Sequence, residues 1–256
     1  MNAVVPDSTR LRQCWQAGGA AVGGWSVSAD PLVAELVAAA DLDVVCVDAQ
    51  HGYADVATLP PVLSAMRVVG RMPLVRVRWN DPGQIMRALD AGASGVVVPM
   101  IDTADDAFAA AQACRFPPHG IRSWGPLWSA RPILQPTEAD QQALCVLMVE
   151  TADAVANLDA IMATPGVDAL YIGPNDLALS CGFGRATYRT DPAVAELLSS
   201  IIERAHAVDL PVGLHCSDVA MAADWRDRGA DWLTALTDVD ILAAGLTAAV
   251  GALRND

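Results

Sequence analysis

The 256-residue chain is 53% hydrophobic and carries a formal net charge of -14 at pH 7, a composition typical of a globular protein. The excess of negative charge disfavours nucleic acid as a partner, and no apolar run is long enough to predict a membrane span. All 16 basic residues are arginine, which excludes catalysis through a lysine imine, lysine-anchored pyridoxal phosphate and a Walker A phosphate site.

The amino-terminal segment and the cysteines indicate the compartment. Residues 1–12 are polar and lack the apolar core of a secretory signal. The six cysteines form no C-x-x-C pair, and most of them lie in apolar stretches. This pattern predicts buried free thiols in a reducing environment. We therefore expect a cytoplasmic protein.

Short β-rich apolar runs alternate with amphipathic, alanine-rich stretches along the chain. The runs predict eight strands, at Ala20–Val27, Asp43–Val47, Pro73–Val77, Ser94–Val98, Leu144–Val149, Asp168–Ile172, Pro211–Leu214 and Asp231–Ala235. The stretches between and after them predict eight helices, at Pro31–Ala40, Val56–Val69, Pro82–Ala91, Ala104–Cys114, Ala152–Ala163, Pro192–Val208, Asp218–Gly229 and Asp238–Leu253. This alternation predicts an α/β protein, a single (β/α)8 TIM barrel over residues 1–256.

Turn and cap residues support these boundaries. Asp81-Pro82 and Asp191-Pro192 are typical of a helix N-cap followed by proline at the first helical position. A glycine follows a predicted helix at Gly92 and ends another at Gly229, as expected for helix stops. A doubly wound open sheet is the competing architecture, although no G-x-G-x-x-G motif follows the first strand.

Polar residues follow several of the predicted strands at their carboxyl ends, where TIM barrels place their active sites. They are Asp48, His51, Arg76, Glu150, Gly173–Asp176 and His215. Because the carboxyl ends of parallel strands meet at one face of the barrel, these distant segments are expected to converge there.

Glu150 and Asp176 are separated by one strand–helix unit and are expected at the ends of adjacent strands. Neighbouring strands lie about 4.8 Å apart, so the two carboxylates could share one cation. Oxygen ligands without cysteine or histidine suit Mg²⁺ or Mn²⁺. The alternative is that both residues form structural salt bridges with arginines.

His51 is the leading candidate for general acid/base catalysis, because a histidine titrates near neutral pH and this one follows a strand. A structural or surface role is the alternative. His119 and His206 are interpreted as structural or solvated, and His215 is a secondary candidate at a strand end.

Arg76 ends a predicted strand, and its planar guanidinium is suited to clamp a substrate carboxylate through two hydrogen bonds. The alternative is an ion pair with Glu150 or Asp48. Arg122 lies in a loop whose relation to the site is left open by the sequence.

The chain resembles the metal-dependent class II pyruvate aldolases of the HpcH/HpaI family, from near residue 20 to residue 250. Seven segments in the same order carry the resemblance: Val47–Gly52, Arg76–Pro82, Asp90–Ala93, Val98–Met100, Arg115–Ser123, Val149–Thr151 and Ile172–Leu177. Each segment alone is weakly specific, whereas the ordered set is specific.

The resemblance implies roles for individual residues. Glu150 and Asp176 match the ligands of a divalent metal, Mg²⁺, Mn²⁺ or Co²⁺. Arg76 matches the arginine that holds the pyruvate carboxylate and steadies the enolate. His51 matches the histidine that transfers protons together with a carboxylate corresponding to Asp90.

The resemblance also implies substrate contacts and an assembly. The substrate is expected to contact Ser123 and the segment Gly173, Pro174, Asn175 and Asp176, whose backbone N–H groups would bind the carboxylate of the 2-oxo acid. The family is usually a hexamer of pairs that exchange a helix. The apolar final helix Ile241–Leu253 fits such an interface, but it equally fits packing on its own barrel.

Two positions depart from many members of the family. Met148 stands where glutamine is common, two residues before the metal glutamate, and Gln50 stands where glutamate precedes the histidine. We interpret the chain as one of a subgroup, and the departures leave the native substrate open.

The expected function is therefore a lyase that cleaves or forms 4-hydroxy-2-oxo acids, releasing pyruvate or hydroxypyruvate and an aldehyde. A related carbon–carbon lyase or synthase with an acyl-CoA partner is the alternative, although no basic cluster suits the coenzyme phosphates. A non-catalytic sensor that kept the barrel is disfavoured because Glu150, Asp176, His51 and Arg76 are all present.

Overall fold

The computed structural model describes residues 4–127 and 133–254. Eight parallel strands close into a barrel in the order β10-β2-β3-β5-β6-β7-β8-β9. Their bounds are β2 Ala21–Ser26, β3 Val44–Asp48, β5 Leu74–Arg76, β6 Gly95–Val98, β7 Leu144–Val149, β8 Ala169–Ile172, β9 Val212–His215 and β10 Trp232–Thr237. The predicted TIM barrel is confirmed, and the open doubly wound sheet is wrong.

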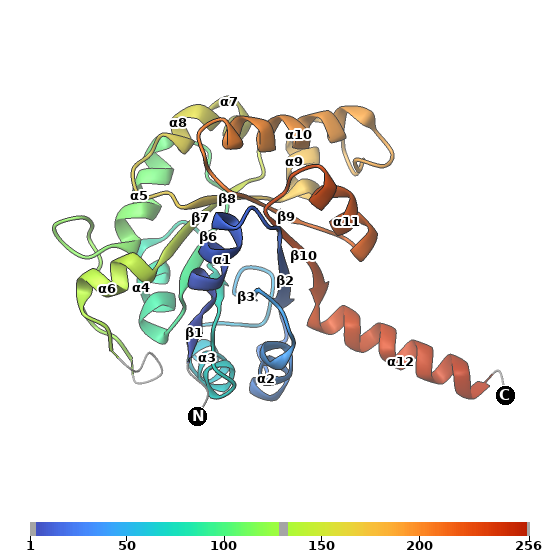
Figure 1. Cartoon of the computed structure of the whole chain (residues 1–256), viewed down its shortest axis with the longest axis horizontal. Coiled ribbons are helices and arrows are strands. Elements are labelled where there is room, and N and C mark those ends of the chain that lie inside the picture. Colours follow the sequence, from blue (N-terminus) through green and yellow to red (C-terminus); the bar gives the residue numbers. More distant parts are fainter. Residues whose placement is uncertain (1–3, 128–132, 255–256) are drawn as a thin grey trace.

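The helices lie around and beyond the barrel (Figure 1). They are α1 Asp7–Gln16, α2 Pro31–Ala39, α3 Leu59–Val68, α4 Pro82–Ala91, α5 Ala104–Cys114, α6 Pro136–Gln142, α7 Ala152–Ala156, α8 Leu158–Met162, α9 Pro174–Ser180, α10 Pro192–His206, α11 Val219–Asp227 and α12 Asp238–Arg254. The helix predicted at Ala152–Ala163 is two helices, because Asn157 leaves helical geometry while its side-chain amide donates to the carbonyl of Asp102 at 2.8 Å.

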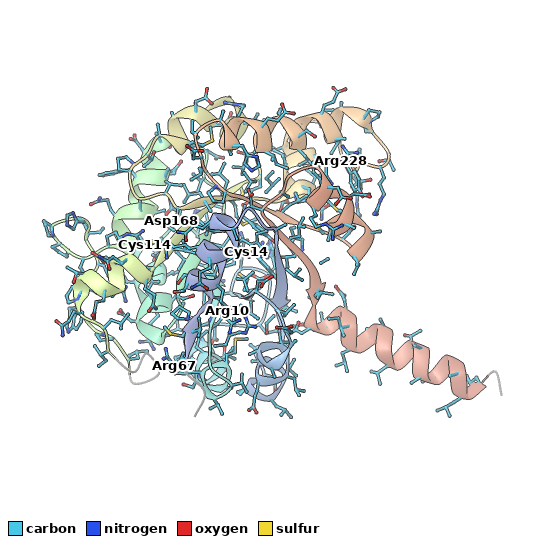
Figure 2. All side chains as sticks on the ribbon, in the orientation of Figure 1. Arg10, Cys14, Arg67, Cys114, Asp168 and Arg228 are labelled. Atoms are coloured by element: carbon cyan, nitrogen blue, oxygen red, sulfur yellow. The ribbon has the colours of Figure 1, made fainter. Side chains whose placement is uncertain are left out.

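The amino-terminal segment forms structure that the sequence did not predict. Strand β1 Val5–Pro6 pairs with β4 Arg71–Met72. The buried Asp7 of α1 accepts from Arg71 at 3.2 Å and from the backbone N–H of Val45 at 2.7 Å. In Figure 2, Cys14 of α1 and Asp168 lie at the same part of the barrel. Arg12 of α1 donates to Asp168 at 3.1 Å. These contacts close the amino-terminal end of the barrel.

Except at Val22 of β2, which is exposed, both faces of the barrel strands are largely buried, as expected for a parallel sheet covered by helices. The inward face carries large side chains, including Trp25, Tyr171 and Trp232. The outward face packs against the helices. The capping predictions are confirmed, because Asp81 accepts from the backbone N–H of Gln84 at 2.9 Å and Gly92 adopts a φ of 109°.

The cysteines and the hydropathy of the helices agree with the sequence. All six cysteines are free thiols, and four of them are buried. Within residues 4–127 and 133–254, no helix is both long and apolar enough to span a membrane.

Helix α12 extends away from the barrel instead of packing on it (Figure 1). Its first residue, Asp238, accepts hydrogen bonds from the hydroxyl of Ser26 and the backbone N–H of Val27, which fixes the start of the helix. Beyond that point, six of its large apolar side chains are exposed: Val239, Ile241, Leu242, Leu246, Val250 and Leu253. Packing of this helix on its own barrel, one of the two alternatives above, is therefore wrong.

Candidate active site

Asp48 and Arg76 meet at the carboxyl ends of neighbouring strands, where the register of β3 and β5 places them opposite each other. The Nε of Arg76 donates to Oδ1 of Asp48 at 2.9 Å, and Nη2 donates to Oδ2 at 2.5 Å. Burial alone would raise the pKa of Asp48, but the hydrogen bonds and charge of Arg76 outweigh it and leave this pKa below its usual value. Both groups are therefore charged at neutral pH.

Trp25 holds this ion pair in place from inside the barrel. Its Nε1 donates to Oδ2 of Asp48 at 3.1 Å, and the guanidinium carbon of Arg76 lies 5.0 Å from the centre of its ring. An indole face attracts a cation at this distance. Two of the three guanidinium nitrogens are thus occupied, and the third, Nη1, has no hydrogen-bond partner in the described part of the chain.

The loop that carries His51 is shaped by the same carboxylate. Oδ1 of Asp48 accepts from the backbone N–H groups of Gln50 at 3.0 Å and His51 at 3.3 Å. Gly52 lies so close to the carbonyl oxygen of Asp48 that a Cβ there would collide with it. The imidazole of His51 itself is exposed at the carboxyl-terminal face of the barrel.

Glu150 is a buried carboxylate on the same face. Its Oε1 accepts from the backbone N–H of Met100 at 2.7 Å. Met100 adopts a φ of 55°, a left-handed conformation that costs a non-glycine residue about 1–2 kcal/mol. Burial raises the pKa of Glu150, and the charge of nearby Asp176 raises it further. Within the described residues, no cation lies within ion-pair distance of either carboxylate.

Gly173 has no side chain, and the space beside it is occupied by the carboxylate of Glu150. Residues 149 and 172 are paired in register, so the residues that follow them face each other. A Cβ on Gly173 would lie 2.8 Å from Oε2 of Glu150 and 3.2 Å from Cε of Met148. Met148, the departure from the family pattern, therefore places an apolar side chain inside the barrel directly beneath Gly173.

A divalent cation fits Glu150 and Asp176. A buried carboxylate beside a second carboxylate is destabilised unless a positive charge offsets the burial and the repulsion. The described residues contain no cluster of three or more His, Cys, Asp or Glu side chains placed to hold a metal. Two carboxylates with remaining positions open to water and substrate are typical of Mg²⁺ sites, and they are atypical of closed structural zinc sites.

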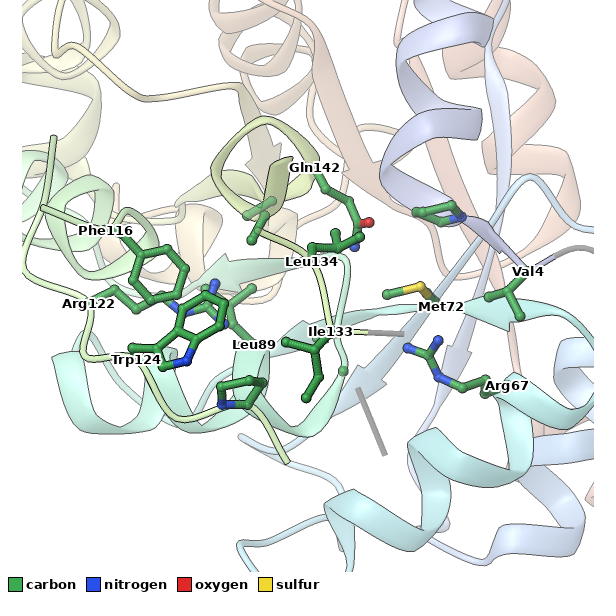
Figure 3. A pocket seen from close by; sticks show the side chains of 16 residues that line it. Val4, Arg67, Met72, Leu89, Phe116, Arg122, Trp124, Ile133, Leu134 and Gln142 are labelled. Carbon is green, nitrogen blue, oxygen red and sulfur yellow. The ribbon is translucent and has the colours of Figure 1, made fainter. Parts of the chain in front are cut away.

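Two predicted site residues lie elsewhere in the chain. Asp90 is at the carboxyl end of α4 and therefore at the amino-terminal end of the barrel, where its Oδ1 accepts from Nη2 of Arg122 at 2.9 Å. Ser123 follows Arg122 in the loop between α5 and α6 and is exposed. Figure 3 shows Arg122 beside Phe116 and Trp124 in a cavity of about 220 Å³ at this end. A single chain does not bring Asp90 or Ser123 together with His51.

The other histidines divide as the sequence indicated. Nε2 of His206 lies 2.8 Å from Oδ2 of Asp231, which is a structural contact. His119 is exposed in the loop after α5. His215 lies at the end of β9, within hydrogen-bond distance of the hydroxyl of Tyr171.

Sequence reasoning missed two contributors to this face. Trp25 was part of a predicted strand, and only the barrel closure brings its Nε1 to Asp48. Met100 acts through its backbone N–H, and the one available signal was its place in the Val98-Pro99-Met100 segment at a strand end.

Comparisons with known proteins agree on one family. The model of the HpcH/HpaI aldolase/citrate lyase family matches residues 22–242. The chain is 36% identical over 240 residues to the hydroxypyruvate/pyruvate aldolase of Rhizorhabdus wittichii, covering 92% of this chain and 94% of that protein. It is 35% identical over 245 residues to a 4-hydroxy-2-oxo-heptane-1,7-dioate aldolase of Salmonella arizonae, covering 93% and 92%. Its fold is similar to the crystal structure of an HpcH/HpaI aldolase/citrate lyase family protein from Burkholderia cenocepacia, with a TM-score of 0.88, 30% identity and coverage of 96% and 98%.

Proposed function

Because the chain belongs to the HpcH/HpaI aldolase/citrate lyase family and is a carbon–carbon lyase of that family, we propose that it cleaves and forms 4-hydroxy-2-oxo acids in a metal-dependent reaction. The products of cleavage are pyruvate or hydroxypyruvate and an aldehyde. The observation that carries the proposal is the buried carboxylate of Glu150, which lies beside Asp176 and has no cation partner in the described chain. A reaction with an acyl-CoA partner has less support, because the similar proteins named above as aldolases cover more than nine tenths of this chain.

We assign the metal to Glu150 and Asp176, and Mg²⁺, Mn²⁺ and Co²⁺ are the expected ions. When bound, the metal would polarise the 2-oxo group and stabilise the enolate by supplying positive charge. The backbone N–H of Met100 holds Glu150 in place, and Gly173 leaves its second oxygen free of a neighbouring Cβ.

The remaining groups bind substrate and move a proton. The backbone N–H groups of Asn175 and Asp176 would bind the carboxylate of the 2-oxo acid, because Pro174 has no N–H and that of Gly173 donates to the carbonyl of Val149 at 3.3 Å. The free Nη1 of Arg76 would donate to the oxygen that becomes negative in the enolate, and Asp48 and Trp25 fix its direction. In cleavage, His51 would accept the proton of the 4-hydroxyl as the bond between C3 and C4 breaks, and the electron pair of that bond would form the enolate as the aldehyde leaves. A proton returned to C3 would then convert the enolate into pyruvate or hydroxypyruvate.

Asp90 and Ser123 can take part in this chemistry only if a neighbouring subunit brings them to the site. In one chain they lie at the amino-terminal end of the barrel, opposite His51. We therefore propose that the active site is completed across an interface between subunits.

A pairwise exchange of α12 is a second part of the assembly that we propose. An apolar groove of about 180 Å³ lies over β2, β10 and α11, and its lining includes Val22, Val219 and Leu236. Val22 is 49% exposed, although strands of a parallel barrel are normally covered on both faces. This is where a final barrel helix would pack, and the α12 of a second subunit would bury both apolar surfaces. The number of pairs, three in a hexamer, is the expectation from the family.

The function is tested by measuring pyruvate release from a panel of 4-hydroxy-2-oxo acids, with each divalent ion and with chelator. We expect release from at least one member of the panel, only with metal. Release that requires coenzyme A, or none from any member, would contradict the proposal.

A further inference from the structure

His215 is a half-buried residue at the end of β9, and its imidazole packs against aromatic side chains inside the barrel. Its edge lies against Trp25, with ring centres 5.1 Å apart. Its Nδ1 is 3.2 Å from the hydroxyl oxygen of Tyr171, whose ring stacks on Trp25 at 5.5 Å. Gly213, two residues earlier on the same face of β9, makes this possible, because a Cβ there would collide with the Tyr171 ring.

The protonation of this pair is fixed by its surroundings. Burial and, to a smaller extent, the positive charge of Arg76 lower the pKa of His215 to about 4, while the negative charge of Asp48 opposes this shift. Burial also raises the pKa of the Tyr171 phenol well above its usual value. Both groups are thus neutral at pH 7. We infer that the phenol hydroxyl donates to Nδ1, which places the single N–H of the neutral imidazole on Nε2.

His215 also borders a cavity beside the carboxyl end of β9. Of the two ring nitrogens of His215, Nδ1 alone has a hydrogen-bond partner within the described part of the chain. His215 lines a cavity of about 150 Å³ together with Pro174 and Asn175, which belong to the segment proposed to bind the 2-oxo acid. Ser217 and Thr187 add hydroxyl groups to the same wall.

The charge of this cavity is balanced. Arg189 is the cation among its lining residues, all of which the structure describes. Its two terminal nitrogens donate to the two carboxylate oxygens of Asp218, at 2.8 and 3.0 Å. A carboxylate on the substrate would have to compete with Asp218, whereas a hydroxyl group needs only a neutral donor.

We propose that the cavity receives the aldehyde partner of the reaction, and that Nε2–H of His215 donates to a hydroxyl on its second carbon. The preferred aldehydes are then short, uncharged 2-hydroxyaldehydes. Tyr171 acts as a positioning residue that sets the tautomer of His215. This inference rests on the proposed aldolase function and names the substrate class of the same site.

The test is aldol addition of pyruvate to glycolaldehyde and to acetaldehyde, which lacks the hydroxyl, in the metal-loaded protein. The ratio of the two kcat/KM values is the measured quantity. We expect the wild type to favour glycolaldehyde, and His215→Phe to lower this ratio on the order of 10-fold, as for a lost neutral hydrogen bond. Tyr171→Phe, which keeps the ring but removes the hydroxyl, should lower the ratio in the same direction. Cys216→Ser changes the next side chain, which packs with the outer core, and should leave the ratio unchanged.

Equal lowering of both rates in His215→Phe and Tyr171→Phe would overturn the inference while leaving the aldolase function intact. A preference of the wild type for succinic semialdehyde, which carries a distal carboxylate, would also overturn it. No addition product with any aldehyde would instead contradict the proposed function itself.

Discussion

Arg76 holds Asp48 with two nitrogens, and its third has no partner in the described part of the chain, so Arg76 is an ion-pair partner and also a candidate substrate contact. The two interpretations that the sequence left open are therefore compatible. Asp48 in turn accepts from Trp25 and from the loop of His51, so a single carboxylate orients the arginine and the histidine together.

Replacement of this arginine by lysine tests the arrangement. Arg76→Lys keeps the charge, but a point charge on a flexible stem cannot hold both oxygens of Asp48 and still aim a donor at the enolate. We expect kcat/KM for pyruvate release to fall about 10²-fold, as for loss of one preorganised donor. The melting temperature should fall by only a few degrees.

Arg204→Lys is the matched control, because Arg204 also binds a carboxylate, Asp159, through two nitrogens, but does so at the surface of α10. Its kcat/KM should stay close to that of the wild type. If Arg76→Lys unfolds the protein or turns over normally, the assigned role of Arg76 is wrong.

At the scale of elements, the strands were predictable because each buried parallel strand is a continuous apolar run. Helix α1 was not, because it is polar and depends on Asp7 meeting Arg71, which is 64 positions away. The strand-end rule predicted that Glu150 and Asp176 would be neighbours. The left-handed backbone of Met100 could not be predicted, because nothing in a methionine indicates a φ of 55°.

The position of Asp90 shows a limit of reasoning from resemblance. The resemblance implied a role beside His51, whereas the order of elements alone places the end of a helix at the amino-terminal end of the barrel. Asp90 can act beside His51 only if the Asp90 of one subunit reaches the His51 of another.

Gly173 offers a test at the junction of β8 and α9. A Cβ in Gly173→Ala would lie 2.8 Å from Oε2 of Glu150, so the carboxylate must move. We expect the apparent affinity for Mn²⁺ to fall on the order of 10-fold or more, as when the support of a metal ligand is disturbed. Titration of the protein with Mn²⁺ by calorimetry measures this directly.

Gly83→Ala is the control, since Gly83 lies in the exposed first turn of α4, where its Cβ would meet only the side chain of Asp81. Unchanged Mn²⁺ affinity in Gly173→Ala would remove Glu150 from the metal site.

At the scale of the whole molecule, α12 is 17 residues long, roughly 25 Å, and presents apolar side chains to solvent along its length. Figure 2 shows these side chains without neighbours from the barrel. An apolar helix exposed in this way is unfavourable in an isolated chain, and the groove at Val22 is the surface on which we propose that the α12 of a second subunit packs.

A charge in either surface should therefore break the pairs. We expect Val22→Asp and Leu246→Asp each to shift the assembly toward smaller species, measured by light scattering after size-exclusion chromatography. Val208→Asp is the control, because Val208 is similarly exposed, at 56%, in the loop before β9. A wild-type protein that is monomeric at micromolar concentration would contradict the exchange of α12.

The central claim is that Glu150 and Asp176 hold a metal that stabilises an enolate of a 2-oxo acid. Exchange of the methyl hydrogens of pyruvate with D₂O, followed by proton NMR, tests this most directly because it requires no knowledge of the aldehyde. We predict that the methyl hydrogens exchange when Mg²⁺ is present. With Co²⁺ or Mn²⁺ we also predict exchange, which is measured after the reaction is quenched and the ion is removed. Exchange should be lost in EDTA and in the variants Glu150→Gln and Asp176→Asn, both of which should remain folded. Exchange that continues undiminished in excess EDTA, or that survives in both variants, would contradict the account.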